Sequence, residues 1–244
     1  MPENSFIRID ESMYIASPEY CFLQAANEMT LQDAVTLACD LCAIYIKDKY
    51  EEYGQRRREI ITSTEQISGY LDHAKNIHGI NKAKRAVTYA LNRANSPMES
   101  RLATIIMLPL FCGGYGLIKP ELNKDVLLSE DGAAHLGRPV CCCDMVWEKQ
   151  KIVLEYDSNL SHLSIKQHYK DKKRATALGL SDYKVIQITA ADVQSFRPIE
   201  NLFLMIRNAL GQRTFPDRWD KYYDKRWKVV RNVMFGINDD RPYT

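Results

Sequence analysis

The stretch Cys143-Asp144-Met145-Val146-Trp147, then Glu148-Lys149-Gln150-Lys151, then Ile152-Val153-Leu154-Glu155-Tyr156-Asp157 decides the fold of this chain. It predicts two apolar strands joined by a tight polar turn, because β-branched and aromatic residues favour strands. Three acids lie inside these strands, although acids are poor strand formers and are costly to bury. Their presence favours a hairpin that is built around a cation.

The position of the turn predicts which residues of the two strands face each other. If the hairpin is symmetric about its turn, Trp147 faces Ile152 and Asp144 faces Glu155, with Cβ atoms about 5 Å apart. Side chains alternate along a strand, so Asp157 shares a face with Glu155. The sequence therefore predicts that three carboxylates converge on one small volume.

Two interpretations of these acids remain open at this point. Opposed like charges destabilise a hairpin unless something neutralises them, and a hard divalent cation with oxygen ligands would do so. Mg²⁺ typically uses one or two carboxylates, several waters and a substrate phosphate. The alternative is a solvent-facing edge on which the acids point into water.

Length and charge set wide limits on function. The chain has 244 residues and a formal net charge of +2, so one large or two modest domains fit, and charge neither requires nor excludes nucleic acid. It contains no apolar run of about 18 residues, which predicts no transmembrane helix. The start Met1-Pro2-Glu3-Asn4 does not have the pattern of a signal peptide.

The seven cysteines do not suggest a disulfide framework. Cys141, Cys142 and Cys143 are consecutive, and neighbours in a strand point to opposite faces. Cys39-x-x-Cys42 lies in an apolar helical pattern and lacks the second pair of a zinc site. Buried free thiols and a cytoplasmic protein are expected.

The first 95 residues are expected to be mainly helical. Ser17-Pro18-Glu19 predicts a helix start, and apolar residues at helical spacing predict one helix from Leu31 to Tyr50. A charged loop is expected from Glu51 to Glu59. Further helices are expected from Thr64 to Ile77 and from Ile80 to Ala94.

The second part is expected to begin with a capping box at Ser96-Pro97-Met98-Glu99, followed by an apolar helix to about Phe111. Gly113-Gly114-Tyr115-Gly116 is expected to form the turn that ends it. A strand from Glu121 to Leu128, a loop over 131–139, the acidic hairpin, a helix from Ser164 to Leu178, a strand from Tyr183 to Thr189 and a helix from Ile199 to Leu210 are expected next.

This order, with one acid in the second strand and an acid-x-acid in the third, resembles the PD-(D/E)xK nuclease superfamily and, more narrowly, its very-short-patch-repair-like endonucleases. The segments that carry the resemblance are Ser96-Pro97-Met98-Glu99-Ser100-Arg101, Gly116-Leu117-Ile118-Lys119-Pro120-Glu121, Asp144, Glu155-Tyr156-Asp157-Ser158 with His162, Asp171-x-x-Arg174 and Tyr183-Lys184-Val185-Ile186.

The resemblance covers about residues 96–210 and implies an α/β (α+β) fold with a restriction-endonuclease-like α-β-β-β-α-β core. It divides the chain into a helical region (1–95), a nuclease-like domain (96–211) and a basic and aromatic tail (212–244). The first region resembles the helical part, with antitoxin-like features, that precedes this domain in actinobacterial members.

The resemblance implies Mg²⁺-assisted hydrolysis of phosphodiester bonds in DNA, with Mn²⁺ as an alternative ion. Asp144, Glu155 and Asp157 are then the expected metal ligands, and Glu99 would bind the metal through water unless it only caps its helix. His162 is the expected general acid or water-positioning group. Asp157 stands where the wider superfamily has Lys, which leaves the general base open.

A basic helix follows the acidic hairpin. Lys170 is the nearest candidate to replace the missing Lys. Lys166, Lys173 and Arg174 are expected to hold DNA phosphates, and a merely solvated helix face is the alternative. The segment from Arg213 to Arg231 mixes aromatic and basic residues, which either pack on the domain or bind single strands.

Three functions compete for this sequence. The first is a metal-dependent DNA endonuclease or nickase. The second is a non-catalytic, antitoxin-like DNA-binding regulator on a nuclease fold. The third is a helical interaction protein of a defence or toxin system, with residues 1–95 as the partner surface. DNA, a second copy of the chain or a defence-system protein are the expected partners, and a membrane is not.

Overall fold

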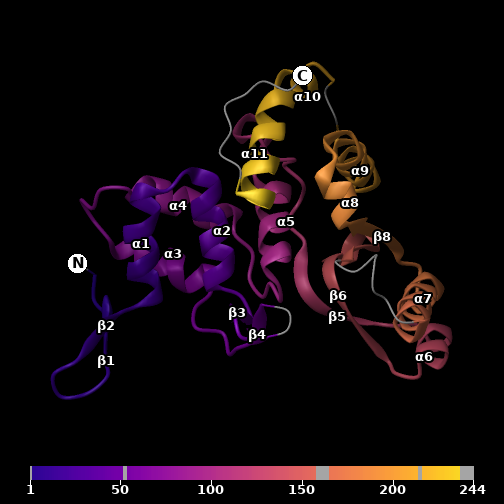
Figure 1. Ribbon diagram of the computed structural model, residues 1–244, viewed down its shortest axis with the longest axis horizontal. Coiled ribbons are helices and arrows are strands. Elements are labelled where there is room, and N and C mark those ends of the chain that lie inside the picture. The colour runs from indigo at the N-terminus through magenta and orange to yellow at the C-terminus, as the bar shows by residue number, and fades with distance from the viewer. Residues whose placement is uncertain (1, 52–53, 158–164, 214–215, 237–244) are drawn as a thin grey trace. The chain divides into compact units, whose positions relative to one another are not determined.

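The computed structural model describes residues 2–51, 54–157, 165–213 and 216–236. It has a mixed α/β architecture (Figure 1). The chain forms two compact units, of which one comprises Met1–Gly116 with Tyr222–Thr244 and the other Leu117–Lys221. We call them the helical unit and the sheet unit. No helix in the described segments is long and apolar enough to cross a bilayer.

The helical unit is a cluster of helices around an apolar core. Its helices are α1 (Pro18–Glu28), α2 (Leu31–Leu41), α3 (Thr64–His73), α4 (Ile80–Tyr89), α5 (Pro97–Met107) and α11 (Tyr223–Phe235), with a 3-10 turn, η1 (Leu110–Cys112). Helix α2 packs against α1, α4 and α5, and α11 packs against α5. Phe22, Leu71, Ile105 and Val230 are fully buried in this unit. The segment expected as a tail thus supplies a core helix, and α5 belongs with the N-terminal helices.

Both predicted helix starts are confirmed. Ser17 accepts a hydrogen bond from the Tyr20 N–H, with Pro18 as the first helical residue. Ser96 Oγ accepts the Glu99 N–H at 3.2 Å. These side chains satisfy backbone donors that a helix leaves without intrahelical partners.

The single helix predicted from Leu31 to Tyr50 is wrong beyond its first half. Helix α2 ends at Leu41, and Tyr45–Lys47 forms strand β3, which pairs with β4 (Gln55–Arg57). Arg58 explains the helix end, because its guanidinium donates to the Asp40 and Leu41 carbonyls at 2.7 and 2.9 Å. Apolar residues continue past this cap at a spacing that also fits a helix, which is why periodicity misplaced the boundary.

Other local differences are smaller. Strands β1 (Phe6–Arg8) and β2 (Tyr14–Ala16) form a hairpin that the sequence did not predict. Helix α5 ends at Met107 and not near Phe111, and the loop expected over 131–139 contains helix α6 (Glu130–Leu136). Ser129 caps α6 and Gly137, with φ +83°, ends it.

The sheet unit contains one four-stranded sheet in the order β5-β6-β7-β8. Its strands are β5 (Glu121–Leu127), β6 (Val140–Trp147), β7 (Ile152–Asp157) and β8 (Lys184–Thr189), and its helices are α6, α7 (Ile165–Leu180), α8 (Ala190–Gln194), α9 (Phe196–Ala209) and α10 (Pro216–Lys221), with a short 3-10 turn, η2 (Glu148–Gln150), joining β6 to β7. Strand β6 is antiparallel to both of its neighbours, β5 and β7, and β8 is parallel to β7. Helix α7 makes the crossover that a parallel pair requires.

Helices α6 and α7 pack together beside this sheet (Figure 1). Cys141, Cys143 and Val153 of the sheet form a buried cluster with Ala177 and Leu178 of α7. This packing fixes the C-terminal half of α7, and so the position of Arg174 one turn earlier, relative to the acidic hairpin.

Candidate active site

The predicted register of the acidic hairpin is confirmed where the strands pair. Trp147 lies opposite Ile152, and the regular pairs run to Met145 opposite Leu154. Asp144 and Glu155 occupy the next position, just beyond these pairs. The Asp144 carboxylate accepts the Tyr156 N–H at 2.9 Å, so a side chain takes the place of a strand carbonyl there.

The pairing of β6 with β5 is also irregular at Asp144. The β5–β6 register places Asn123 across from it, and Asn123 has a left-handed backbone with φ +47°. Cys143 and Val146 both belong to the α7-facing cluster, so the alternation of faces shifts by one residue here. Such irregularities re-aim side chains and are common near active sites.

An arginine from α7 completes this group. The Arg174 guanidinium donates to both Glu155 carboxylate oxygens at 3.2 Å. It also donates to the Cys142 carbonyl at 2.7 Å, which fixes it to strand β6. The Glu155 and Arg174 side chains are 17% and 32% exposed, so the ion pair is only partly accessible to water.

The two carboxylates influence each other electrostatically. Burial, and then the nearby charge of Asp144, raise the pKa of Glu155 to about 8, although Arg174 acts in the opposite direction. Burial also raises the pKa of Asp144, against the stabilising Tyr156 N–H. Glu155 is therefore mainly protonated near neutral pH, and ionisation of both acids would need a cation besides Arg174.

Two thiols lie against this group and were predicted only as buried cysteines. Cys141 and Cys143 are both fully buried, and their side chains interact. The hydrogen bond with Cys143 lowers the pKa of Cys141 to about 6, and the same contact raises the pKa of Cys143. All seven cysteines are free, as predicted. Cys21 and Cys142 are exposed and Cys112 is partly exposed, so the prediction that the thiols are buried is wrong for these three.

The other predicted residues of this region are placed as follows. Asp157 ends β7, opposite Thr189 of β8, and is partly exposed. Lys170 is exposed one turn before Arg174 on α7, and Lys173 is partly exposed. His162 lies outside the described residues, as does the side chain of Lys166.

Glu99 lies in the helical unit and takes part in the capping box. Its carboxylate accepts the Asn95 N–H and the Ser96 hydroxyl, each at 2.9 Å. The side chain is buried, and these two donors satisfy its carboxylate oxygens inside the protein. Its predicted role as a metal group stays a prediction.

Within the described parts of the chain, no three His, Cys, Asp or Glu side chains are grouped so as to hold a metal ion. The described geometry brings together Asp144 and Glu155, and Asp157 as a third ligand stays a prediction. Sequence reasoning placed Arg174 among the phosphate contacts and missed its ion pair with Glu155. The Asp171-x-x-Arg174 motif next to the acidic hairpin was the signal that could have indicated it.

Comparison of the chain with protein-family models, with curated proteins and with solved structures gives no match.

Proposed function

We propose that the sheet unit is a metal-dependent DNA endonuclease or nickase with a restriction-endonuclease-like core. The carrying observation is the pair of acids Asp144 and Glu155, which lie together just beyond the last regular β6–β7 pair with raised pKa values. The order β5, β6, β7, α7 and β8 in the sheet unit supports the proposal, because it follows the β-β-β-α-β part of that core, with helix α6 inserted between β5 and β6. The helix that precedes these strands, α5, belongs to the helical unit.

The donor atoms suit a hard divalent cation. Carboxylate oxygens are the ligands that Mg²⁺ and Mn²⁺ prefer, and one or two of them suffice when water and substrate phosphate complete the shell. Asp144 and Glu155 would hold the ion, with Asp157 as a further candidate. When bound, the ion would polarise the phosphodiester and acidify a water molecule.

The remaining residues would act on the DNA itself. A guanidinium binds phosphate oxygens with two parallel hydrogen bonds, so Arg174 is suited to contact a phosphate beside the acids. Lys170, one turn away, and Lys173 would bind neighbouring phosphates as point charges. We retain His162 as the proposed acid and Lys166 as a proposed phosphate contact.

Cleavage of supercoiled plasmid with Mg²⁺ or Mn²⁺ tests this proposal, together with linear, mismatched and single-stranded substrates. Asp144→Asn removes one ligand charge at nearly constant shape, and we expect cleavage to fall by roughly a hundredfold or more. Asp182→Asn is the matched control, because Asp182 is exposed in the same unit and its φ of +66° suits Asn equally well. Equal cleavage by wild type and Asp144→Asn would exclude the proposal.

The Arg174–Glu155 ion pair favours a second candidate function. Arg174 already forms an ion pair with one of the two acids, Glu155. A protein that binds DNA without hydrolysing it would have no metal ion at this position and would need such a partner for the buried acid. Such a regulator would bind DNA in a salt-sensitive way, and Asp144→Asn would leave that binding unchanged. DNA binding without cleavage of any substrate supports this candidate over the nuclease.

A further inference from the structure

The turn η1 in the helical unit holds an exposed aromatic ring between cationic side chains of two helices. Phe111 is 51% exposed. The Arg85 guanidinium of α4 lies over its ring, with the guanidinium carbon 5.5 Å from the ring centroid, and donates to Cys112 Sγ at 2.9 Å. From α11, Lys225 Nζ donates to the Phe111 carbonyl at 2.7 Å. These contacts fix the ring at the surface of the unit.

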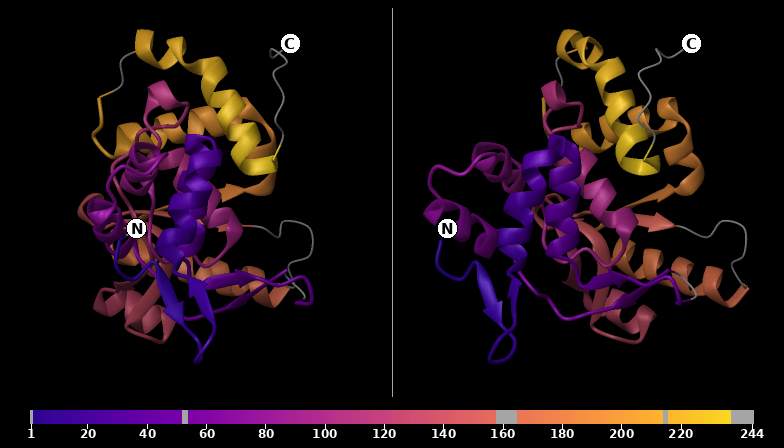
Figure 2. Two further views of the ribbon diagram at one scale, coloured as in Figure 1. Left: turned by 90° about the vertical axis from the view of Figure 1, so that its left-hand side faces the viewer. Right: turned by 60° about the vertical axis from the view of Figure 1, so that its left-hand side comes forward.

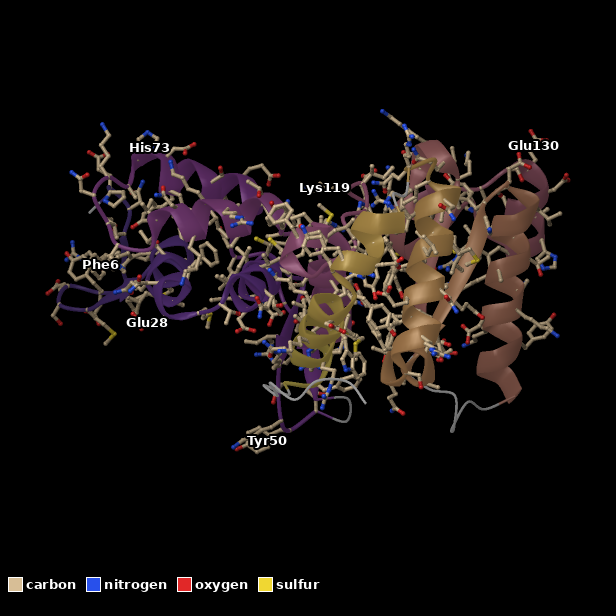
Figure 3. All side chains as sticks on the ribbon, turned by 90° about the horizontal axis from the view of Figure 1, so that it is seen from above. Phe6, Glu28, Tyr50, His73, Lys119 and Glu130 are labelled. Atoms are coloured by element: carbon tan, nitrogen blue, oxygen red, sulfur yellow. The ribbon has the colours of Figure 1, made fainter. Side chains whose placement is uncertain are left out.

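Helix α11 extends this basic surface. Lys228 lies one turn after Lys225, so these two exposed side chains are neighbours on one side of the helix. The opposite side carries the buried Val230 and Met234, and with it α11, yellow in Figures 1 and 2, packs on α5. In Figure 3 α11 lies in front of the other helices of its unit. This part of the basic and aromatic segment therefore packs with one side and exposes lysines on the other.

Acids are rare in the elements that form this surface, which consists of Arg85, Phe111, Lys225 and Lys228 and which we call the η1 surface. Helix α4 has three basic residues, α11 has four, and the single acid in α4, η1 and α11 is Asp224. Lys82 and Lys84 contact groups of α1 and α3, and Arg226 is buried. The remaining cations give the η1 surface a positive charge, which favours a polyanion.

The exposed ring among fixed cations narrows the class of polyanion. Aromatic side chains stack on unpaired bases while neighbouring cations hold the backbone phosphates. An anionic membrane would need a broader apolar face to insert. We propose that the η1 surface binds single-stranded DNA, with Phe111 stacked on a base and the three cations on the flanking phosphates. The choice of DNA rests on the proposed function, although these residues are separate from the proposed metal site.

Comparison of a normal strand with an abasic strand tests the stacking. Fluorescence anisotropy of a labelled strand of about 16 thymidines measures binding by the full chain, without divalent cation so that no cleavage enters the readout. An abasic strand of the same length offers phosphates without bases. We expect wild type to prefer the thymidine strand by roughly fivefold or more, as for one stacked base. Phe111→Ala should lose most of this preference, and Phe111→Tyr should keep it because the ring remains.

Matched variants separate the ring and the charges from general surface effects. Tyr50→Ala should leave binding unchanged, because Tyr50 is 87% exposed in the same unit but lies outside the η1 surface (Figure 3). Lys228→Gln should reduce the slope of log Kd against log salt by about 0.7, as for one lost phosphate contact on a single strand. Lys75→Gln changes another exposed lysine of the unit and should leave the slope unchanged.

Each outcome decides for or against the η1 surface, once circular dichroism shows that the variants are folded. Equal binding of both strands by wild type would show that charge alone holds them, as on a surface for an acidic protein, and would overturn the proposal. A Phe111→Ala variant that binds like wild type, or a wild type that binds no single strand, would overturn it as well. Plasmid cleavage tests the nuclease proposal separately, so the two proposals can fail independently.

Discussion

Glu155 is the residue on which the electrostatics of the sheet unit depend. It is largely buried, it lies beside a second acid, Asp144, and it is held by one arginine, Arg174. Burial and the neighbouring acid outweigh the arginine, so Glu155 has a pKa near neutrality. A group of this kind changes its charge near neutral to mildly alkaline pH, so the binding of a cation at this site would be linked to the loss of a proton.

Stability should therefore depend on pH through Glu155. Its pKa is about 8 in the folded protein and about 4.3 in an unfolded chain, so the folded state binds more protons between these values. The free energy of unfolding should fall as pH rises through this window. Thermal melts should show this fall in wild type, and Glu155→Gln, which cannot ionise, should show a smaller one.

Added Mg²⁺ should counteract this loss in wild type. Carboxylate ligands must be deprotonated to bind a metal, so we expect the melting temperature to rise more near pH 8 than near pH 5. Glu155→Gln should lose most of this rise. A Mg²⁺ effect that is the same at both pH values, or the same in both proteins, would contradict the assignment of Glu155 as a ligand.

At the scale of elements, the turn after α5 depends on glycine for space. Gly113 has φ +87°, in the left-handed region that glycine tolerates best. A Cβ on Gly114 would lie 2.1 Å from the Leu108 carbonyl oxygen, which belongs to the backbone and cannot simply rotate away. The turn therefore accepts no side chain at position 114.

Gly114→Ala should lower the free energy of unfolding by about 3 kcal/mol, because the backbone must move to admit the methyl group. Gly69→Ala is the control, since its Cβ would meet nothing within 4 Å in the interior of α3. There we expect a gain of about 0.5–1 kcal/mol from the better helix former. Chemical denaturation measures the free energy of unfolding of both variants. If Gly114→Ala changes it no more than Gly69→Ala does, the turn does not depend on glycine at position 114.

The elements also show where the sequence was informative. Two apolar runs separated by a polar four-residue turn predicted the β6–β7 hairpin, and symmetry about that turn predicted its register. Strands β1 to β4 have three residues each and are too short for alternation to distinguish them from a helix. The contact of Arg174 with Glu155 joins residues 19 positions apart, and only the packing of α7 on the sheet reveals it.

At the scale of the whole molecule, the two units have separate cores. The helical unit buries Phe22 and Val230, and the sheet unit buries Val153 and Leu178. Units of this kind often unfold as separate cooperative transitions.

Differential scanning calorimetry should therefore resolve two contributions to unfolding. Gly114→Ala should lower the transition temperature of the helical unit. Glu155→Gln should change how the transition temperature of the sheet unit depends on pH. A single transition that both variants shift together would show instead that the units unfold as one.

The position of α11 has a consequence for how the protein is made. The chain begins the helical unit, builds the whole sheet unit from Leu117 to Lys221, and only then adds α11, which buries Arg226, Val230 and Met234. On the ribosome the sheet unit is therefore complete before the last helix of the earlier unit has emerged. Until α11 emerges, the N-terminal helices expose the part of their core that α11 covers, and chaperones can bind there. A nascent chain that stops before residue 223 keeps this part of the core exposed.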